Sequence, residues 1–148
     1  MKLALAFILG MVAMVCIQGR SQSEHDRSKT WLVFSGLAHH FDGNGYCNNR
    51  FTKGIGLEHK GYAIGVYDNS NCDTSFYAAK AWRPLQSGSW RGGAIAGVVS
   101  GYGSPALPIA GLVVTYERKT WGLTATLIPP VGPSSGVAWI QIKRAFEW

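Results

Sequence analysis

Eight short segments of alternating apolar and polar residues follow one another along most of this chain, and the connections between them are alternately short and long. None of the segments has a helical apolar period long enough to compete with a strand. In an antiparallel meander the short connections share one rim and the long connections share the other. The expected fold is therefore all-β, an eight-stranded antiparallel up-and-down transmembrane β-barrel. The predicted strands are 31–41, 51–59, 61–68, 75–83, 89–102, 109–117, 120–128 and 137–146.

The first 21 residues have the features of an export signal. Lys2 precedes an apolar run from Leu3 to Ile17, which is shorter than the roughly 20 residues of a membrane-spanning helix. A lipoprotein site at Cys16 is disfavoured, because Val15 is bulkier than the residue that such cleavage prefers. The remaining length fits a single domain. We expect a signal peptide over 1–21, an N-terminal arm over 22–30 and the barrel over 31–148.

The charge of the chain is mildly basic. Its formal net charge is +6 at pH 7, and removal of the leader takes away Lys2 and Arg20. The sequence has no run of Lys and Arg of the kind that binds phosphate backbones. We therefore expect no nucleic-acid partner.

Two cysteines remain after cleavage of the leader, Cys47 and Cys72, and they fall in the first and second long connections. The periplasm and the cell surface are oxidising, so one disulfide between them is the simplest expectation.

The aromatic residues are sorted along the predicted barrel. Tryptophans gather near the rim of short connections, while one tryptophan and two tyrosines lie toward the other rim. The first group is Trp31, Trp82, Trp90, Trp121 and Trp148, and the second is Trp139, Tyr67 and Tyr102. Aromatic girdles at the two membrane interfaces produce such a distribution. The alternative is a soluble lipocalin-like cup whose tryptophans close its base.

Four stretches carry a resemblance to a known family. They are 46–57 (YCNNRFTKGIGL), 65–84 (GVYDNSNCDTSFYAAKAWRP), 94–101 (AIAGVVSG) and 124–129 (TATLIP). The most specific part is Trp82-Arg83-Pro84, which is followed by a glycine-rich strand. In these stretches the chain resembles the lipid A palmitoyltransferase family, small eight-stranded barrels of the Gram-negative outer membrane.

The resemblance implies an enzyme that transfers an acyl chain from a phospholipid to lipid A. Its partners would be phospholipid, lipopolysaccharide and the outer-membrane bilayer, and it would act as a monomer without a cofactor. The acyl chain would enter a largely apolar barrel interior. Ala81 occupies the position of the family's glycine at the floor of this cavity, so the resemblance implies an acyl group slightly shorter than palmitate.

The polar site of the family is a histidine near the outer end of the first strand and an Asp-Ser pair at the outer end of the third. The serine corresponds to Ser70, but Asn69 precedes it and Asp68 lies one place earlier. Asp68-Asn69-Ser70 is also an ordinary turn sequence. If chemistry occurs, direct attack by an acceptor hydroxyl is more economical than a serine-bound intermediate, with Ser70 and Asn69 as oxyanion or headgroup contacts.

The position of the family histidine corresponds to Ser35 or Gly36, and the nearest histidines, His39 and His40, are displaced toward the loop. Histidine suits a general base because its unperturbed pKa lies near neutrality. Strand alternation sends only one of the pair into the barrel, and His40 is the preferred one because Leu37 and Phe41 make the better outward set. The alternative is a polar loop with a solvent-exposed histidine.

A metal site and a non-enzymatic function are the two alternatives to an acyltransferase site. His39, His40, Asp42 and Asp73 match no closed set of zinc ligands, so no metal site is expected. The competing class of function is a non-enzymatic barrel for lipid binding or surface interaction. An open apolar cavity with an inward His40 favours the enzyme, and an interior plugged by Tyr77, Lys80 and Trp82 favours the non-enzymatic barrel.

Overall fold

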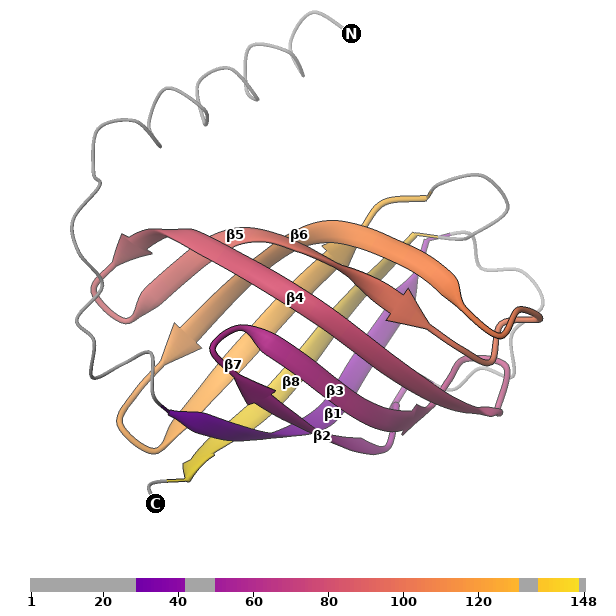
Figure 1. Cartoon of the computed structure of the whole chain (residues 1–148), viewed down its shortest axis with the longest axis horizontal. Helices are drawn as coiled ribbons and strands as arrows, with labels where there is room; N and C mark the ends of the chain where they lie inside the picture. Colours follow the sequence, from indigo (N-terminus) through magenta and orange to yellow (C-terminus); the bar gives the residue numbers. More distant parts are fainter. Residues whose placement is uncertain (1–28, 42–49, 131–135, 147–148) are drawn as a thin grey trace, which may run out of the picture.

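The eight strands close into one antiparallel barrel (Figure 1). The computed structural model describes residues 29–41, 50–130 and 136–146. The predicted leader (1–21), most of the arm, Cys47 and Trp148 lie outside these ranges. The strands are β1 (Thr30–His40), β2 (Gly54–His59), β3 (Tyr62–Asp68), β4 (Thr74–Ser87), β5 (Trp90–Val99), β6 (Leu107–Glu117), β7 (Trp121–Ile128) and β8 (Val137–Phe146).

Each strand pairs with the next one along the chain, and β8 closes the barrel against β1, where Thr30 faces Phe146. The described residues are all-β, and they include no helix long and apolar enough to cross a membrane. The predicted all-β, eight-stranded antiparallel barrel is thus confirmed as a fold.

The connections alternate in length as predicted. The short ones follow β2, β4 and β6, and the long ones follow β1, β3, β5 and β7. Lys60 and Gly61 connect β2 to β3 with φ angles of 51° and 79°. A two-residue hairpin of type I′ needs positive φ at both central positions, and it matches the twist of the flanking strands. We call the two ends of the barrel the tight-turn end and the long-loop end.

β4 is the strand that departs most from its predicted bounds. The sequence predicted a turn over 84–88, but the strand continues to Ser87 through an irregularity between Trp82 and Leu85. Pro84 lies in that irregularity with its side chain exposed. Proline has no N–H to donate to a ladder, and a bulge is one of the few places where a strand tolerates it.

The outer surface of the barrel is apolar and much of its interior is polar. Exposed side chains on the strands include Phe34, Leu57, Ile64, Leu112 and Ile142. In β8 the exposed Ile140 and Ile142 alternate with the buried Gln141 and Lys143, as the sequence pattern predicted. Toward the long-loop end the interior also contains an apolar cluster of Tyr67, Tyr77 and Val99.

The aromatic residues are placed only partly as predicted. Trp82, Trp90 and Trp121 are exposed at the tight-turn end, where the ring of Tyr116 lies 5.0 Å from that of Trp90 and 5.6 Å from that of Trp121. Trp31 is instead buried in the barrel, and the rings of Trp139 and Tyr67 pack together at 5.0 Å in the interior. The prediction that Trp31, Tyr67 and Trp139 belong to interfacial girdles is therefore wrong.

Candidate functional site

A cavity of about 310 Å³ occupies the interior of the barrel and extends from mid-barrel to the long-loop end. One wall is aliphatic and comes from β5 and β6. The adjoining part of the lining is aromatic and comes from β3, β4 and β8, and Tyr67 and Tyr77 pack with Val99 in one buried cluster. The side chains that form the two walls are Ile95, Val99, Leu107 and Ile109, and Tyr67, Tyr77 and Trp139.

The aromatic wall is held by specific contacts. The ring centroid of Tyr77 lies 6.0 Å from that of Tyr67 and 5.9 Å from that of Trp139. Tyr67 and Tyr102 share a hydrogen bond between their hydroxyls at 3.0 Å. Trp139 donates from Nε1 to Oγ1 of Thr52 at 3.0 Å. Tyr67 and Trp139 are therefore held by partners in the loops that follow β5 and precede β2.

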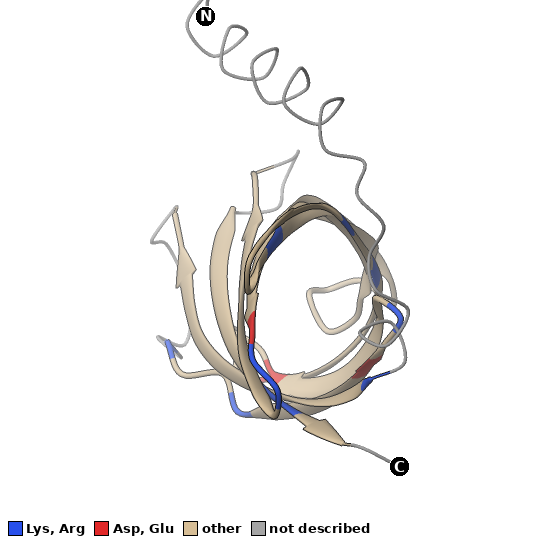
Figure 2. Cartoon of the chain, turned by 90° about the vertical axis from the view of Figure 1, so that its left-hand side faces the viewer, with Lys and Arg blue, Asp and Glu red and all other residues tan. Residues whose placement is uncertain are grey.

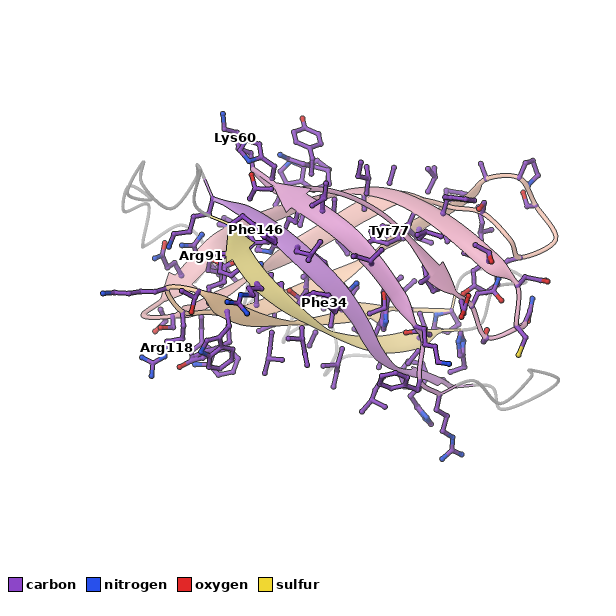
Figure 3. The ribbon with its side chains drawn as sticks, turned by 90° about the horizontal axis from the view of Figure 1, so that it is seen from below. Phe34, Lys60, Tyr77, Arg91, Arg118 and Phe146 are labelled. Atoms are coloured by element: carbon purple, nitrogen blue, oxygen red, sulfur yellow. The ribbon has the colours of Figure 1, made fainter. Side chains whose placement is uncertain are left out.

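Two glycines make room for the ring of Tyr77. A Cβ atom on Gly56 would lie 2.3 Å from the Tyr77 hydroxyl, and one on Gly65 would lie 2.6 Å from the ring. Gly56 and Gly65 face each other across β2 and β3. The glycines therefore let the Tyr77 ring approach the backbone of β2 and β3 closely, while the ring also packs with Tyr67 and Val99. In Figure 3 the labelled Tyr77 lies farther along the barrel than Lys60, Arg91 and Arg118, which mark the tight-turn end.

His40 lines this cavity, whereas His39 is exposed on the outside of the barrel. The register between β1 and β8 shifts between Phe34 and Leu37. Trp31 and Val33 face inward before the shift, so strict alternation would also direct His39 inward. The shift reverses the alternation and sends His40 inward instead, because one additional residue flips every later side chain.

The turn after β3 uses Asn69 for structure. Its side chain is fully buried, and Nδ2 donates to Oγ of Ser75 and to the carbonyl of Gly101, both at 2.9 Å. Oδ1 accepts from the backbone N–H of Asn71 at 2.8 Å and of Asp73 at 3.0 Å. The amide of Asn69 therefore ties β4 and the loop after β5 to this turn.

The other two predicted residues of this turn differ from Asn69 and from each other. Asp68 is exposed at the end of β3 and does not line the cavity. Ser70 is buried, and its hydroxyl has no hydrogen-bond partner among the described residues. Neither side chain shares the cavity lining with His40, while Asn71 does. Of the polar residues predicted at the long-loop end, His40 lines the cavity. Asn71 also lines it, and no feature of the sequence predicted that role.

The floor of the cavity lies at Ala81, Glu58 and Arg83. Ala81 is buried and faces inward, the position expected for the cavity floor. Lys80 and Trp82, its neighbours, face outward, and Nζ of Lys80 lies 3.6 Å from the ring centroid of Tyr62. Of the three residues that would plug the interior in the non-enzymatic alternative, only Tyr77 faces inward, and it lies against the wall.

The ladder between β6 and β7 is incomplete where these strands border the cavity. β6 begins at Leu107, but its pairing with β7 starts only at Leu112 opposite Leu127. Continuing the same register would bring Pro129 opposite Ala110, and a proline has no N–H for a ladder hydrogen bond. The cavity lining in this region includes the exposed residues Pro108, Ala110 and Pro129. The β6–β7 ladder therefore stops short of the long-loop end, beside exposed residues that also line the cavity.

Charged residues near the tight-turn end form a second internal feature. The sequence places Arg83 and Arg91 beside the short connections, where rim cations are expected, but both point into the barrel and pair with Glu58 and Glu117. Lys60 and Arg118 do lie at the rim (Figure 3). Alternation places Glu58 on the opposite strand face from the apolar Leu57, but it does not identify the partners of Glu58.

The described residues show no group of three or more His, Cys, Asp or Glu side chains that would hold a metal ion. Cys72 lies in the loop after β3 with φ of 63°, and Cys47 lies outside the described ranges, so their pairing stays a prediction.

No protein-family model matches the chain, and no curated protein matches it.

Proposed function

We propose that the chain is an outer-membrane enzyme that draws the acyl chain of a phospholipid into its barrel and transfers it to a hydroxyl of lipid A. The observation that carries this proposal is an internal cavity with aliphatic and aromatic walls, a small residue at its floor and one histidine in its lining near the long-loop end. The proposal divides into a location, a substrate site and a chemical step.

The membrane location rests on the outer surface. Large apolar side chains, such as Leu57, Ile64 and Leu112, cover the outward face of the strands, while Lys143, Gln141 and other polar residues are buried inside. In water this arrangement would expose a large apolar surface, and in a bilayer it removes that surface from water. The exposed tryptophans at the tight-turn end fit one membrane interface.

The substrate site rests on the shape of the cavity. A single acyl chain would lie along the aliphatic and aromatic lining with its end near Ala81. The incomplete ladder between β6 and β7 gives such a chain a lateral path from the outer leaflet. Lipid A occupies the outer leaflet, so donor and acceptor would meet at the long-loop end.

The chemical step rests on His40. Its imidazole would accept the proton of the acceptor hydroxyl as this oxygen attacks the ester carbonyl of the phospholipid. The bond between the carbonyl carbon and the glycerol oxygen then breaks, and the imidazolium returns the proton to that oxygen. The products are acylated lipid A and a lysophospholipid, with no further reactant needed.

The test is an acyl-transfer assay with refolded protein, phospholipid vesicles and lipid A, read by mass spectrometry. We expect His40→Ala to lower the rate by about 10²- to 10⁴-fold, the usual cost of losing a general base. His39→Ala is the matched control, because His39 lies on the outer face, and it should stay near the wild-type rate. Equal rates in the two variants, with folding verified by heat-modifiable gel migration, would remove His40 from the mechanism.

A second candidate function is lipid binding without chemistry. It is favoured by Asp68 and Ser70, which lie outside the cavity lining, and by Asn69, whose amide is used within its turn. This candidate predicts that the wild-type protein retains a phospholipid through purification but yields no acylated lipid A. The assay above separates the two functions.

A further inference from the structure

Five charged side chains form a continuous chain across the lumen near the tight-turn end. Arg83 Nη1 lies 2.5 Å from Glu58 Oε1, and Lys143 Nζ lies 3.3 Å from Glu58 Oε2. The same Nζ lies 2.5 Å from Glu117 Oε1, and Arg91 Nε lies 3.2 Å from Glu117 Oε2. These residues come from β4, β2, β8, β6 and β5, so the chain joins walls on all sides of the barrel. Figure 2 views the barrel from this end, with acidic and basic positions around the ring.

The chain of ion pairs separates two cavities. The cavity described above lies on its long-loop side. A second cavity of about 760 Å³ lies at the tight-turn end and includes the rim residues Lys29 and Lys60. Glu58, Ala81 and Arg83 line both cavities. The partition between the two is therefore as thin as these side chains, and the Glu58–Arg83 ion pair is part of it.

The wall next to the partition is polar. Thr115, Thr124 and Gln141 face one another across β6, β7 and β8, and all three are buried. The next row toward the tight-turn end is Glu117, Gly122 and Lys143, which belongs to the partition.

Several buried polar atoms along this route lack a partner. Oγ1 of Thr115, Oγ1 of Thr124 and Nε of Arg83 make no hydrogen bond within the described residues. Buried polar groups without protein partners are commonly satisfied by ordered water. Thr115 and Thr124 lie one row from the partition and Arg83 is part of it, so unpartnered polar atoms continue from the long-loop side to the partition itself.

We propose that the barrel interior is a narrow pathway for small inorganic anions, closed in its resting state by the ion pairs of Glu58 and Glu117. The second cavity is lined by five cationic residues and two carboxylates, which favours anions at its mouth. The five cations are Lys29, Lys60, Arg83, Arg91 and Lys80, the last of which faces outward over Tyr62 and borders the cavity at the rim beside Lys60. Opening would require the Arg83 side chain to leave Glu58, which lines both cavities, and Lys143 to release one of its two carboxylates. This proposal does not depend on acyl transfer.

The test is single-channel recording of the refolded full chain in planar lipid bilayers under a KCl gradient. We expect the wild-type protein to give rare openings with a reversal potential displaced toward that of chloride. Glu58→Gln removes the carboxylate that holds both Arg83 and Lys143, and it should raise the open probability by about tenfold or more, because a broken buried pair is strongly destabilised. Asp73→Asn is the matched control, since it neutralises an exposed carboxylate in the loop after β3, and it should leave the openings unchanged.

Arg83→Gln breaks the same link from the other side and serves if Glu58→Gln does not fold, as judged by heat-modifiable migration. A wild-type protein that gives no openings in long recordings would overturn the proposal. So would cation-selective openings, or a folded Glu58→Gln or Arg83→Gln variant with the open probability of the wild type.

Discussion

At the scale of single residues, the orientation of His40 depends on one irregularity in β1. The buried Trp31 and Val33 set an alternation that the register shift between Phe34 and Leu37 reverses. A Cβ atom on Gly36 would lie 2.5 Å from the carbonyl oxygen of Ile140, so the glycine is required where the strand shifts. The sequence offered either His39 or His40 as the inward residue. The preference for His40 came from the apolar character of Leu37 and Phe41, both of which are exposed.

Ala81 controls the depth of the cavity in our account. If the acyl chain ends there, Ala81→Gly should lengthen the transferred chain, and Ala81→Met should shorten it by about two carbons, since overfilling a packed site costs more than the roughly 0.8 kcal/mol gained per buried methylene. Mass spectrometry of the acylated product measures this directly. A product length that is the same in all three proteins would show that the chain does not reach residue 81.

Gly56 is predicted to be intolerant of a side chain for a local reason. Gly56→Ala forces the Tyr77 ring off the wall, and we expect a loss of about 1–3 kcal/mol in the free energy of unfolding. Gly92→Ala is the control, because a Cβ atom there would meet its nearest neighbour, Leu85, at 3.7 Å, an ordinary contact. Urea titration of the two variants in detergent micelles compares them, and equal stability would mean that Tyr77 moves freely.

At the scale of strands and loops, much of the architecture was predictable from the sequence. Period-two alternation gave eight strands, and connection length sorted them into hairpins and loops. The bounds of β8 were predicted to the residue, and its apolar and polar positions alternate from Ile140 to Lys143. β4 was predicted too short, because Pro84 reads as the start of a turn and its place in a bulge depends on pairing with β5.

The ion pairs and the inward tryptophans could not be assigned from alternation alone. Period two states which residues share a face, but not which face is inside. The partners of Glu58 lie 25 and 85 residues away in sequence, and only barrel closure brings them together. The sites that remained unpredicted are those that depend on three or more strands.

We attribute the incomplete pairing between β6 and β7 to Pro129 and Pro130. Replacing both Pro129 and Pro130 by alanine restores two N–H donors opposite Ile109 and Ala110, and we expect the β6–β7 ladder to extend. Amide hydrogen exchange of residues 109–111 should slow, and lipid transfer should fall. Pro105→Ala in the exposed loop after β5 is the control and should change neither. Unchanged transfer with an extended ladder would mean that the substrate enters elsewhere.

The predicted bridge between Cys47 and Cys72 joins the loops after β1 and β3. It would enclose about 25 residues and stabilise the barrel by on the order of 3 kcal/mol, chiefly by restricting the unfolded chain. Mass spectrometry of exported, non-reduced protein after alkylation should show neither thiol modified. Modification of both thiols would contradict the bridge.

At the scale of the whole molecule, the barrel is divided along its axis. The tight-turn half holds the ion pairs and the larger cavity, and the long-loop half holds the apolar cavity with His40. This division separates the proposed lipid chemistry from the proposed anion pathway, so each can be lost without the other. The apolar outer surface extends over both halves, and in the proposed function it faces the bilayer.

The most direct measurement of the proposed function is mass spectrometry of lipid A from Gram-negative cells that express the chain. Cells with the wild-type protein, or with His39→Ala, should contain lipid A that is heavier by one acyl group. Cells with His40→Ala should contain unmodified lipid A, with the barrel still present in the outer-membrane fraction. Unmodified lipid A in cells whose outer membrane contains the folded wild-type protein would contradict the account.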